Sequence, residues 1–339
     1  MKYEYCIFIM RAQPFHNAHE ALIKMALQKG EQVVVIFGSY KKSPDPKNPW
    51  TGEQREQMMR ESFTEAENAR IKVILMRDYL YNDMLWIADL TQKVSEITED
   101  STSICLLGHE HDRSSYYLKL FPQWELVNVN NIDEFPHATE IRDLYFTHDV
   151  RYKNFVPAKT ALFLEEFKKT ETFKNLKTSY DALVEYKLMW EGAPFPPTFV
   201  TVDAVVVKSG HILVVRRGGN YGKGQIALPG GFVNQDERIK DAAIRELKEE
   251  TAIKLPKDDL KNAIVDERVF DHPNRSLRTG RTISHAFLLD LKSGALPQVK
   301  GNDDAAKSWW MPLREFYSRE EEFFEDHYHI ISYFCSRGI

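Results

Sequence analysis

Three prolines close together, Pro194, Pro196 and Pro197, separate two regions with different hydrophobic patterns. Before them, short apolar runs alternate with longer amphipathic stretches, whereas after them apolar strands follow one another with tight turns between. Because clustered prolines cannot continue a helix, they mark a boundary. The chain has 339 residues, enough for one long domain or two ordinary ones. The change of pattern favours two domains, over residues 1–156 and 198–339, with a connector over 157–197.

The first region has the pattern of a doubly wound α/β domain. Four apolar runs are too short for helices and predict buried strands, at residues 6–9, 33–37, 73–76 and 104–107. The amphipathic stretches between and after them predict helices at about 18–29, 52–66, 84–98 and 113–120. This alternation predicts a parallel sheet with helices on both faces. Such sheets bind ligands beyond the carboxyl ends of their strands, so the loop after the first strand is of interest.

The remaining regions have other patterns. Residues 157–197 carry no strand signal, and their apolar spacing predicts a helical connector. From residue 198 onward, apolar runs at 199–207 and 212–215 flank a Ser209-Gly210 turn and predict a hairpin. One strong helix is predicted at about 236–251 among further strands, which indicates an α+β domain.

Composition limits the partners and the location. The 45 basic and 50 acidic residues give a net charge of −5, so we expect no general nucleic-acid partner. No stretch approaches the roughly 18 apolar residues of a membrane span, and no signal-peptide pattern opens the chain. Three cysteines cannot all pair, and two of them stand in apolar runs. We therefore expect reduced thiols in a cytoplasmic protein.

Three glutamates crowd one face of the helix predicted at 236–251. Glu246, Glu249 and Glu250 are spaced i, i+3 and i+4, so their carboxylates repel one another. A hard divalent cation, Mg²⁺ or Mn²⁺, would remove that conflict and also bridge to the phosphates of a substrate. The alternative is a solvated acidic helix face without any function.

The segment around these glutamates resembles the Nudix box, G-x5-E-x7-R-E-U-x-E-E-x-G-U, in which U is a bulky aliphatic residue. The positions that match are Gly231, Glu237, Arg245, Glu246, Leu247, Glu249, Glu250 and Ile253. Ala252 departs, because it stands where the family has glycine; if that position needs a positive φ, alanine adds about 1 kcal/mol of strain.

This resemblance implies a Nudix fold that hydrolyses nucleoside diphosphates linked to another group. It implies that Glu246, Glu249 and Glu250 bind the metal and that Glu249 and Glu250 take part in catalysis. It further implies that the substrate is bound at the following positions: Gly231, Arg245, Arg275 and Arg278. A solvated basic loop is the alternative explanation for the two arginines beyond the box.

In the first region, Arg11, His16 and His19 follow the first predicted strand, and the two histidines stand at a predicted helix start. A helix N-terminus offers unpaired N–H groups and a positive dipole end, which favour phosphate. Imidazole and guanidinium groups there would stabilise charge that builds up on a phosphoryl group. A metal-binding pair, or histidines packed beneath the loop, are the alternatives.

The same loop resembles the nucleotidyltransferase signature G-R-F-x-P-x-H-x-G-H. Arg11, Pro14, His16 and His19 match, whereas Met10, Ala12 and Ala18 stand where the family has Gly, Phe and Gly. The segment around Thr139 and Arg142 is similar to the phosphate motif S-x-T-x-x-R of the same family. The resemblance implies a Rossmann-like nucleotidyltransferase in which His16, His19 and Arg142 are catalytic and Arg11 and Thr139 bind nucleotide.

Further segments resemble nicotinamide-mononucleotide (NMN) adenylyltransferases of the archaeal type. By this resemblance, ATP or NMN is bound by Asn48, Trp50, Asn82 and Trp124. The two tryptophans are candidates to stack on nicotinamide or to line its pocket, although either could simply belong to the core.

The order of the parts resembles the bifunctional NMN adenylyltransferase/Nudix hydrolase family. This implies AMP transfer from ATP to NMN, which gives NAD and pyrophosphate, and hydrolysis of ADP-ribose to AMP and ribose 5-phosphate. The partners are then small molecules, while assembly into a homo-oligomer is left open.

Two other functions are compatible with the sequence. The departures at Met10, Ala12 and Ala18 allow an N-terminal domain that binds nucleotide without catalysis. A non-enzymatic sensor of ADP-ribose or NAD would instead need a damaged metal cluster or an added DNA-binding module. The box is intact, and the tail from Glu320 has the pattern of one acidic and aromatic helix.

Overall fold

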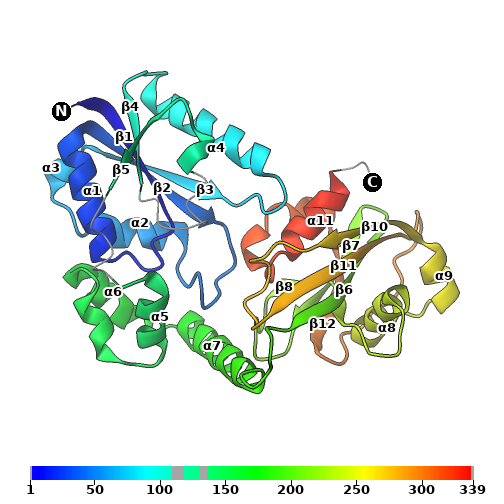
Figure 1. The fold of residues 1–339 in the computed structure, drawn as a ribbon. Helices are drawn as coiled ribbons and strands as arrows, with labels where there is room; N and C mark the ends of the chain where they lie inside the picture. The colour runs from blue at the N-terminus through cyan, green and yellow to red at the C-terminus, as the bar shows by residue number, and fades with distance from the viewer. Residues whose placement is uncertain (1, 109–117, 130–135, 337–339) are drawn as a thin grey trace. The chain divides into compact units, whose positions relative to one another are not determined.

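The alternating strands and helices of the first region form a parallel α/β structure (Figure 1). The computed structural model describes residues 2–108, 118–129 and 136–336. Its first sheet has the strand order β3-β2-β1-β4-β5, and every neighbouring pair is parallel. The strands are β1 (Tyr3–Met10), β2 (Gly30–Tyr40), β3 (Ile71–Arg77), β4 (Ile104–Gly108) and β5 (Glu125–Asn128). The predicted doubly wound parallel sheet is confirmed.

Helices cover the sheet because its strands are apolar on both faces. They are α1 (Asn17–Lys29), α2 (Gly52–Arg60), α3 (Glu65–Asn68), α4 (Asp83–Thr98), α5 (Ala138–Phe146), the 3₁₀-helix η2 (Val150–Asn154) and α6 (Ala158–Phe167). On one face, Val34 and Ile36 of β2 pack with Leu90 and Val94 of α4. Helix α1 contacts β1 and β2 through its own apolar side.

Three elements differ from the sequence expectation. The helix expected at 52–66 is two helices, because the Thr64 side chain accepts the Glu67 N–H and the Glu67 carboxylate accepts the Thr64 N–H, which starts α3 anew. Strand β5 was missed because its side chains are largely exposed and form no apolar run. Most of the helix expected at 113–120 lies outside the described residues.

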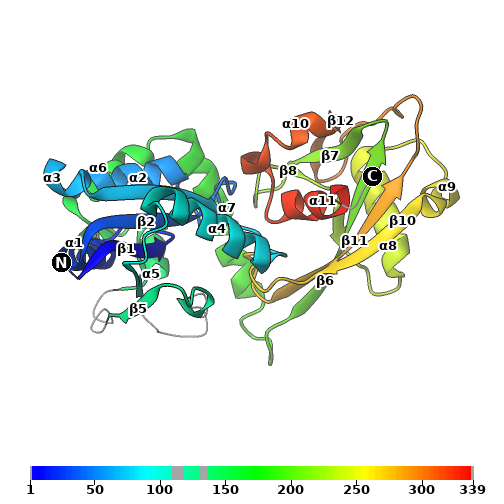
Figure 2. The ribbon, with the colours of Figure 1, turned by 90° about the horizontal axis from the view of Figure 1, so that it is seen from above.

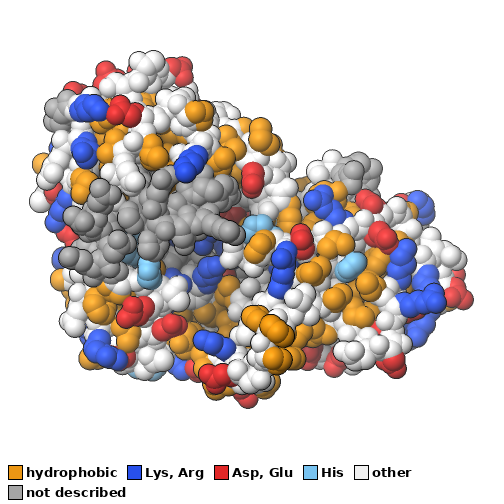
Figure 3. Space-filling view, viewed as in Figure 1, with side chains coloured by type: hydrophobic (Ala, Val, Ile, Leu, Met, Phe, Trp, Pro, Cys, Tyr) orange, Lys and Arg blue, Asp and Glu red, His pale blue; other side chains and the backbone are white. Residues whose placement is uncertain are grey.

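The chain divides into two compact units, Met1–Lys174 and Asn175–Ile339. The division falls within α7 (Glu171–Met189), inside the segment where we expected a helical connector. In the described part of the chain, no helix is both long enough and apolar enough to span a membrane. On the face seen in Figure 3, acidic and basic side chains are interspersed among apolar ones.

The second unit is built on a mixed seven-stranded sheet. The order β10-β11-β6-β7-β12 forms its main path, and β8 and β9 pair with β7 and β6 respectively. The strands are β6 (Thr198–Lys208), β7 (His211–Arg217), β8 (Ile226–Ala227), β9 (Gly230–Phe232), β10 (Ile264–Phe270), β11 (Arg281–Asp290) and β12 (Ala305–Pro312). The predicted α+β class and the hairpin of β6 and β7 are confirmed.

Helix α8 carries the glutamates and packs on this sheet (Figure 2). The helices of the unit beyond α7 are α8 (Ile239–Thr251), α9 (Lys257–Asn262), α10 (Leu313–Phe316), the 3₁₀-helix η3 (Glu320–Glu322) and α11 (His327–Cys335). Ala243 and Leu247 of α8 pack with Val206 of β6 and Leu289 of β11. The tail is not one helix, since η3 ends before α11 begins at His327.

Candidate active sites

The first candidate site lies at the carboxyl end of β1, where the strand order of the sheet reverses. β1 lies between β2 and β4, and parallel sheets bind ligands in the crevice at such a point. The loop after β1 leads directly into α1, whose N-cap residue is His16. This loop therefore brings the N–H groups and the positive dipole end of a 13-residue helix to that crevice.

His16 and His19 stack on each other at the start of α1. Their ring centroids are 3.8 Å apart, and the centroid of the His19 ring is 5.8 Å from that of Phe15. The His16 backbone N–H donates to Nδ1 of His19 over 3.3 Å, so a neutral His19 ring carries its proton on Nε2. Burial lowers the pKa of His16 to about 4 and the pKa of His19 well below its ordinary value. Both rings are therefore neutral hydrogen-bond donors at pH 7.

Arg142 joins the second predicted motif to this loop. Its guanidinium donates to the backbone oxygen of Gln13 over 2.7 Å and to Oγ1 of Thr139 over 3.0 Å. The Gln13 side chain in turn forms two hydrogen bonds with the main chain of Trp50, at 2.9 and 3.1 Å. Three distant segments of the sequence thus meet at the loop that also carries the exposed Arg11.

Two lysines that the sequence analysis missed add positive charge here. Lys42 forms an ion pair with Asp45 at 3.3 Å. Burial lowers the pKa of Lys47 to about 8, and the positive charges of Arg11, Lys42 and Arg142 act in the same direction. Cations gathered beside a helix N-terminus suit a polyphosphate. The unused signal was the Lys41-Lys42 pair at the carboxyl end of the second strand.

The two predicted asparagines lie in different surroundings. Asn48 is buried, and its side-chain nitrogen donates to the Asp45 carboxylate over 3.2 Å. Within the described ranges, its Oδ1 atom has no hydrogen-bond partner. Asn82 is the N-cap of α4, where its Oδ1 accepts the Leu85 N–H over 3.1 Å. Asn48 therefore has a buried acceptor that no described residue uses, whereas Asn82 caps a helix.

The two predicted tryptophans pack among other rings of the core. Trp50 is 2% exposed, and its ring centroid is 5.6 Å from that of Tyr145. Trp124 is 7% exposed and stacks on Phe121 with centroids 4.6 Å apart. Contact with nicotinamide stays a prediction for both indoles.

The backbone does not require glycine at the two positions where the signature has it. Met10 lies in β1 and Ala18 in α1, and neither has a positive φ. Ala12 does adopt a φ of 50°, but the signature has phenylalanine at that position. The departures from the signature therefore do not strain this loop by removing a glycine.

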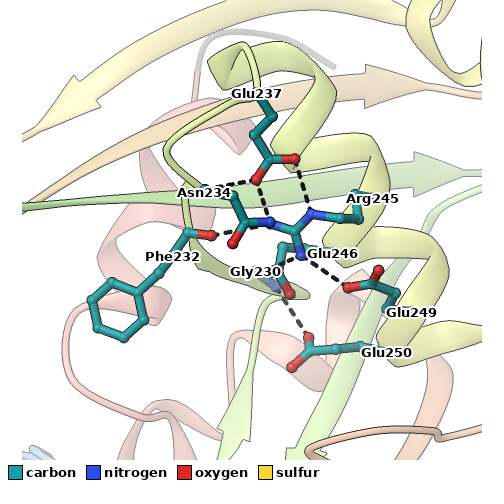
Figure 4. Close-up of polar contacts among 8 residues, drawn as sticks. All are labelled: Gly230, Phe232, Asn234, Glu237, Arg245, Glu246, Glu249 and Glu250. Carbon is teal, nitrogen blue, oxygen red and sulfur yellow. Dashed lines mark hydrogen bonds and ion pairs between the residues drawn. The ribbon is translucent and has the colours of Figure 1, made fainter.

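The second candidate site centres on Arg245 of α8 (Figure 4). Its guanidinium forms ion pairs with Glu237 at 2.6 Å, Glu246 at 2.8 Å and Glu249 at 2.9 Å. It also donates to the carbonyl oxygen of Phe232 over 3.0 Å. The hydrogen bond from Arg245 lowers the pKa of Glu237. Arg245 thereby fixes the loop after β9 to the acidic face of α8.

Glu250 lies on the same helix but is buried. Its carboxylate accepts the Gly230 N–H over 3.0 Å (Figure 4). Burial, and also the charges of Glu246 and Asp203, raise the pKa of Glu250 to about 8. Burial raises the pKa of Glu246 as well. A cation beside these carboxylates would favour their charged forms.

The glycine pair of β9 passes very close to its neighbours. A Cβ atom on Gly231 would lie 2.5 Å from Oε1 of Glu246, and one on Gly230 would lie 2.1 Å from the Val202 carbonyl oxygen. A side chain at position 231 would therefore displace the Glu246 carboxylate, and one at position 230 would force the β9 backbone away from β6. Within the ranges that the structure describes, no three His, Cys, Asp or Glu side chains already converge as a metal centre.

Ala252 ends α8 in the left-handed conformation that the sequence analysis considered, with φ 48° and ψ 27°. Because alanine is strained there and glycine is not, Ala252→Gly should raise the free energy of unfolding by about 1 kcal/mol. Chemical denaturation of the purified chain measures this. Ala263→Gly is the matched control, since Ala263 ends α9 at φ −78° and should gain nothing. Equal effects at both positions would contradict the prediction.

Arg275 and Arg278, both expected to bind the substrate, have different surroundings. Arg275 is 4% exposed and donates to the two carboxylate oxygens of Asp326, each over 3.0 Å. It also lies 3.7 Å from Oδ2 of Asp203. Arg278 is only partly buried, and its guanidinium carbon is 5.3 Å from the centroid of the Phe232 ring. Neither pairing could be predicted from the sequence, because both aspartates are distant from Arg275 along the chain.

Replacing Arg275 with methionine should destabilise the second unit by about 3–5 kcal/mol, because Asp326 and Asp203 would remain buried without their counter-ion. Denaturant-induced unfolding measures the loss. The control is Arg281→Met, since Arg281 forms an exposed pair with Asp271 and should cost about 1 kcal/mol or less. A similar cost for both substitutions would disprove the structural role of Arg275.

Comparisons with known proteins match both units. The family model described as NUDIX domain matches residues 197–334, and the one described as Cytidylyltransferase-like matches residues 7–96. A nicotinamide/nicotinic acid mononucleotide adenylyltransferase of Acinetobacter baylyi is 38% identical over 181 residues, which are 53% of this chain and 95% of that protein. An ADP-ribose pyrophosphatase of Methanocaldococcus jannaschii is 40% identical over 114 residues, which are 34% of this chain and 62% of that protein.

A solved structure matches the chain almost from end to end. It is a bifunctional NMN adenylyltransferase/ADP ribose pyrophosphatase from Francisella tularensis, complexed with AMP and a Mn ion. The TM-score is 0.93 at 37% sequence identity, and the match covers 99% of each chain. Together with the two site geometries, these similarities show that the chain belongs to the family of bifunctional NMN adenylyltransferases/ADP-ribose pyrophosphatases.

Proposed function

We propose that this chain is a bifunctional enzyme of NAD metabolism. Its first unit transfers AMP from ATP to NMN and releases NAD and pyrophosphate. Its second unit hydrolyses ADP-ribose to AMP and ribose 5-phosphate. The observation that carries the proposal is that each unit has charged groups around its own motif: Arg11, Arg142 and two lysines around the loop before α1, and the carboxylates that Arg245 joins on α8.

In the first unit, catalysis needs positioning and charge stabilisation but no covalent enzyme intermediate. A 5′-phosphate oxygen of NMN attacks the α-phosphorus of ATP, and the bond to the bridging oxygen of pyrophosphate breaks. We assign His16 and His19 to the stabilisation of the reacting phosphoryl group, with Nε2–H of His19 as a donor. Arg11, Thr139 and Arg142 would bind the phosphates of ATP, and their place around the α1 loop supports this.

The remaining nucleotide contacts of the first unit are proposed by family resemblance. Asn48 is supported by its buried, unpartnered Oδ1, which suits an N–H donor on the ligand. Trp50, Asn82 and Trp124 would shape the pocket around it. Trp50 would do so through the hydrogen bonds that tie its main chain to Gln13.

In the second unit, Glu246, Glu249 and Glu250 would hold a divalent cation, Mg²⁺ or Mn²⁺. The residues fit such a cation, because all three offer carboxylate oxygens, and burial disfavours the charged forms of Glu246 and Glu250 without one. When bound, the cation supplies polarisation of the diphosphate oxygens. Arg245 orients the glutamates through its ion pairs, and Gly231 lets the loop approach Glu246.

Small molecules are the proposed partners: ATP, NMN and ADP-ribose. The structure has Cys6, Cys105 and Cys335 as free thiols, which supports the proposed cytoplasmic location.

Product analysis tests both halves of the proposal. ADP-ribose incubated with the full chain should yield AMP and ribose 5-phosphate in equal amounts, with the activity lost in a chelator and restored by Mg²⁺ or Mn²⁺. ATP and NMN should yield NAD and pyrophosphate. A folded protein that lacks either pair of products would contradict the corresponding half.

A further inference from the structure

Two arginines of the second unit form no ion pair with a carboxylate of the described residues. Arg217 is the last residue of β7, and Arg278 lies in the loop before β11. Among the residues that the structure describes, neither guanidinium is within ion-pair distance of an acidic side chain. By contrast, Arg245 pairs with three carboxylates and Arg275 with two. The charges of Arg217 and Arg278 are therefore available to a ligand.

Aromatic rings support both guanidinium groups. The Arg278 guanidinium carbon is 5.3 Å from the ring centroid of Phe232 and 5.4 Å from that of Tyr221. The Arg217 guanidinium carbon is 4.0 Å from the ring centroid of Phe324, which packs edge-on against Tyr221. Contact with ring faces orients a guanidinium without using its N–H groups. Nε–H of Arg217 donates to the Tyr221 carbonyl, and among the described residues its other N–H groups have no hydrogen-bond acceptor, so they could bind an oxyanion.

The charges around Arg217 link this aromatic support to the acidic face of α8. Burial, and then the positive charge of Arg278, lower the pKa of Arg217, while Glu325 and Glu250 act in the opposite direction. The two positive charges repel each other, and a bound anion would relieve the repulsion. The charge of Glu250 acts on the pKa of Arg217, so the two side chains lie in the same part of the site. An anion bound by Arg217 would therefore lie beside the carboxylates proposed to hold the cation.

We propose that Arg217 and Arg278 bind the diphosphate of the substrate of the second unit, a nucleoside diphosphate linked to a sugar. The proposal rests on the hydrolase function proposed above. In this subsite Arg278 acts together with Arg217. Arg275 does not take part, because it is the buried counter-ion of Asp326. Phe232 connects the subsite to the box, since its ring contacts the Arg278 guanidinium and its carbonyl oxygen accepts a hydrogen bond from Arg245.

The test uses Arg217→Met and Arg278→Met in the full chain, because methionine keeps apolar packing on the rings and removes the donors. Each substitution should raise the KM for ADP-ribose about 10- to 100-fold and change kcat much less. NAD formation by the same preparations should be unchanged, which shows that the first unit is intact, and a kcat for ADP-ribose near that of the unmodified chain shows that the second unit is folded. The matched control is Arg268→Met, whose guanidinium carbon lies 3.9 Å from the ring centroid of Tyr333. Its KM should equal that of the unmodified chain.

The dependence of KM on ionic strength is a second readout, and it would not change if the two arginines had a purely structural role. The KM of the unmodified chain should rise with ionic strength, and it should rise less steeply in both variants. Unchanged KM values in the two variants, or an equal rise in Arg268→Met, would overturn the subsite while leaving the hydrolase function in place. An unmodified chain that does not cleave ADP-ribose at all would overturn the hydrolase function and the subsite with it.

Discussion

Replacing Glu249 and Glu250 together with glutamine should lower the rate of ADP-ribose hydrolysis by about a thousandfold or more. Glutamine has nearly the shape of glutamate but is neutral, so it cannot hold a divalent cation in the same way. The side-chain oxygen at position 250 can still accept the Gly230 N–H, and the fold should therefore persist. Chromatographic measurement of AMP released at saturating Mg²⁺ gives the rate.

Two controls accompany this variant. Its NAD formation from ATP and NMN should match that of the unmodified chain, and its thermal unfolding should show no large loss of stability. Glu267→Gln is the matched single control, since Glu267 is an exposed glutamate of β10 that forms an ion pair with Lys240 of α8. AMP release by the double variant within tenfold of the original rate would disprove the assignment of these glutamates.

Replacing His19 with alanine should lower the rate of NAD formation by about 100- to 1000-fold and leave ADP-ribose hydrolysis unchanged. The substitution removes the Nε2–H donor and the ring that stacks on His16. Because the pKa of His19 is far below its ordinary value, the donor is the neutral ring. The NAD rate should therefore show no step between pH 6 and 8 from protonation of His19. Chromatography of NAD across this pH range measures both effects.

His148→Ala is the control for this variant, since His148 is an exposed histidine of the same unit. His19→Asn, which keeps an N–H donor, should recover part of the lost rate. A rate of NAD formation unaffected by His19→Ala would contradict the role given to this side chain.

Local motifs made much of the architecture and of the second site predictable. The residues that Arg245 gathers all lie between positions 232 and 249, so the helix spacing and the adjoining loop already place them together. The left-handed end of α8 at Ala252 could also be anticipated from the glycine that the box has there. The buried strands β1 to β4 follow from their apolar runs.

Contacts between distant segments could not be predicted in this way. Arg275 and Asp326 are 51 positions apart, and nothing in either segment indicates that one neutralises the other. Arg217 stands at the end of an ordinary apolar strand, and its support by Phe324 depends on the tertiary fold. Gln13 likewise joins Arg142 and Trp50 only because three segments meet at the α1 loop. Strand β5 has no apolar face that a pattern could reveal.

The bifunctional account depends most on the first unit, because its loop departs from the nucleotidyltransferase signature at Met10, Ala12 and Ala18. We would supply the Glu249→Gln/Glu250→Gln protein with ATP, NMN and Mg²⁺ and follow NAD by chromatography. We expect NAD to form at the rate of the unmodified chain, and adding His19→Ala should lower that rate by about 100- to 1000-fold. A folded protein that binds ATP but forms no NAD would contradict the account and leave a Nudix hydrolase with a nucleotide-binding domain.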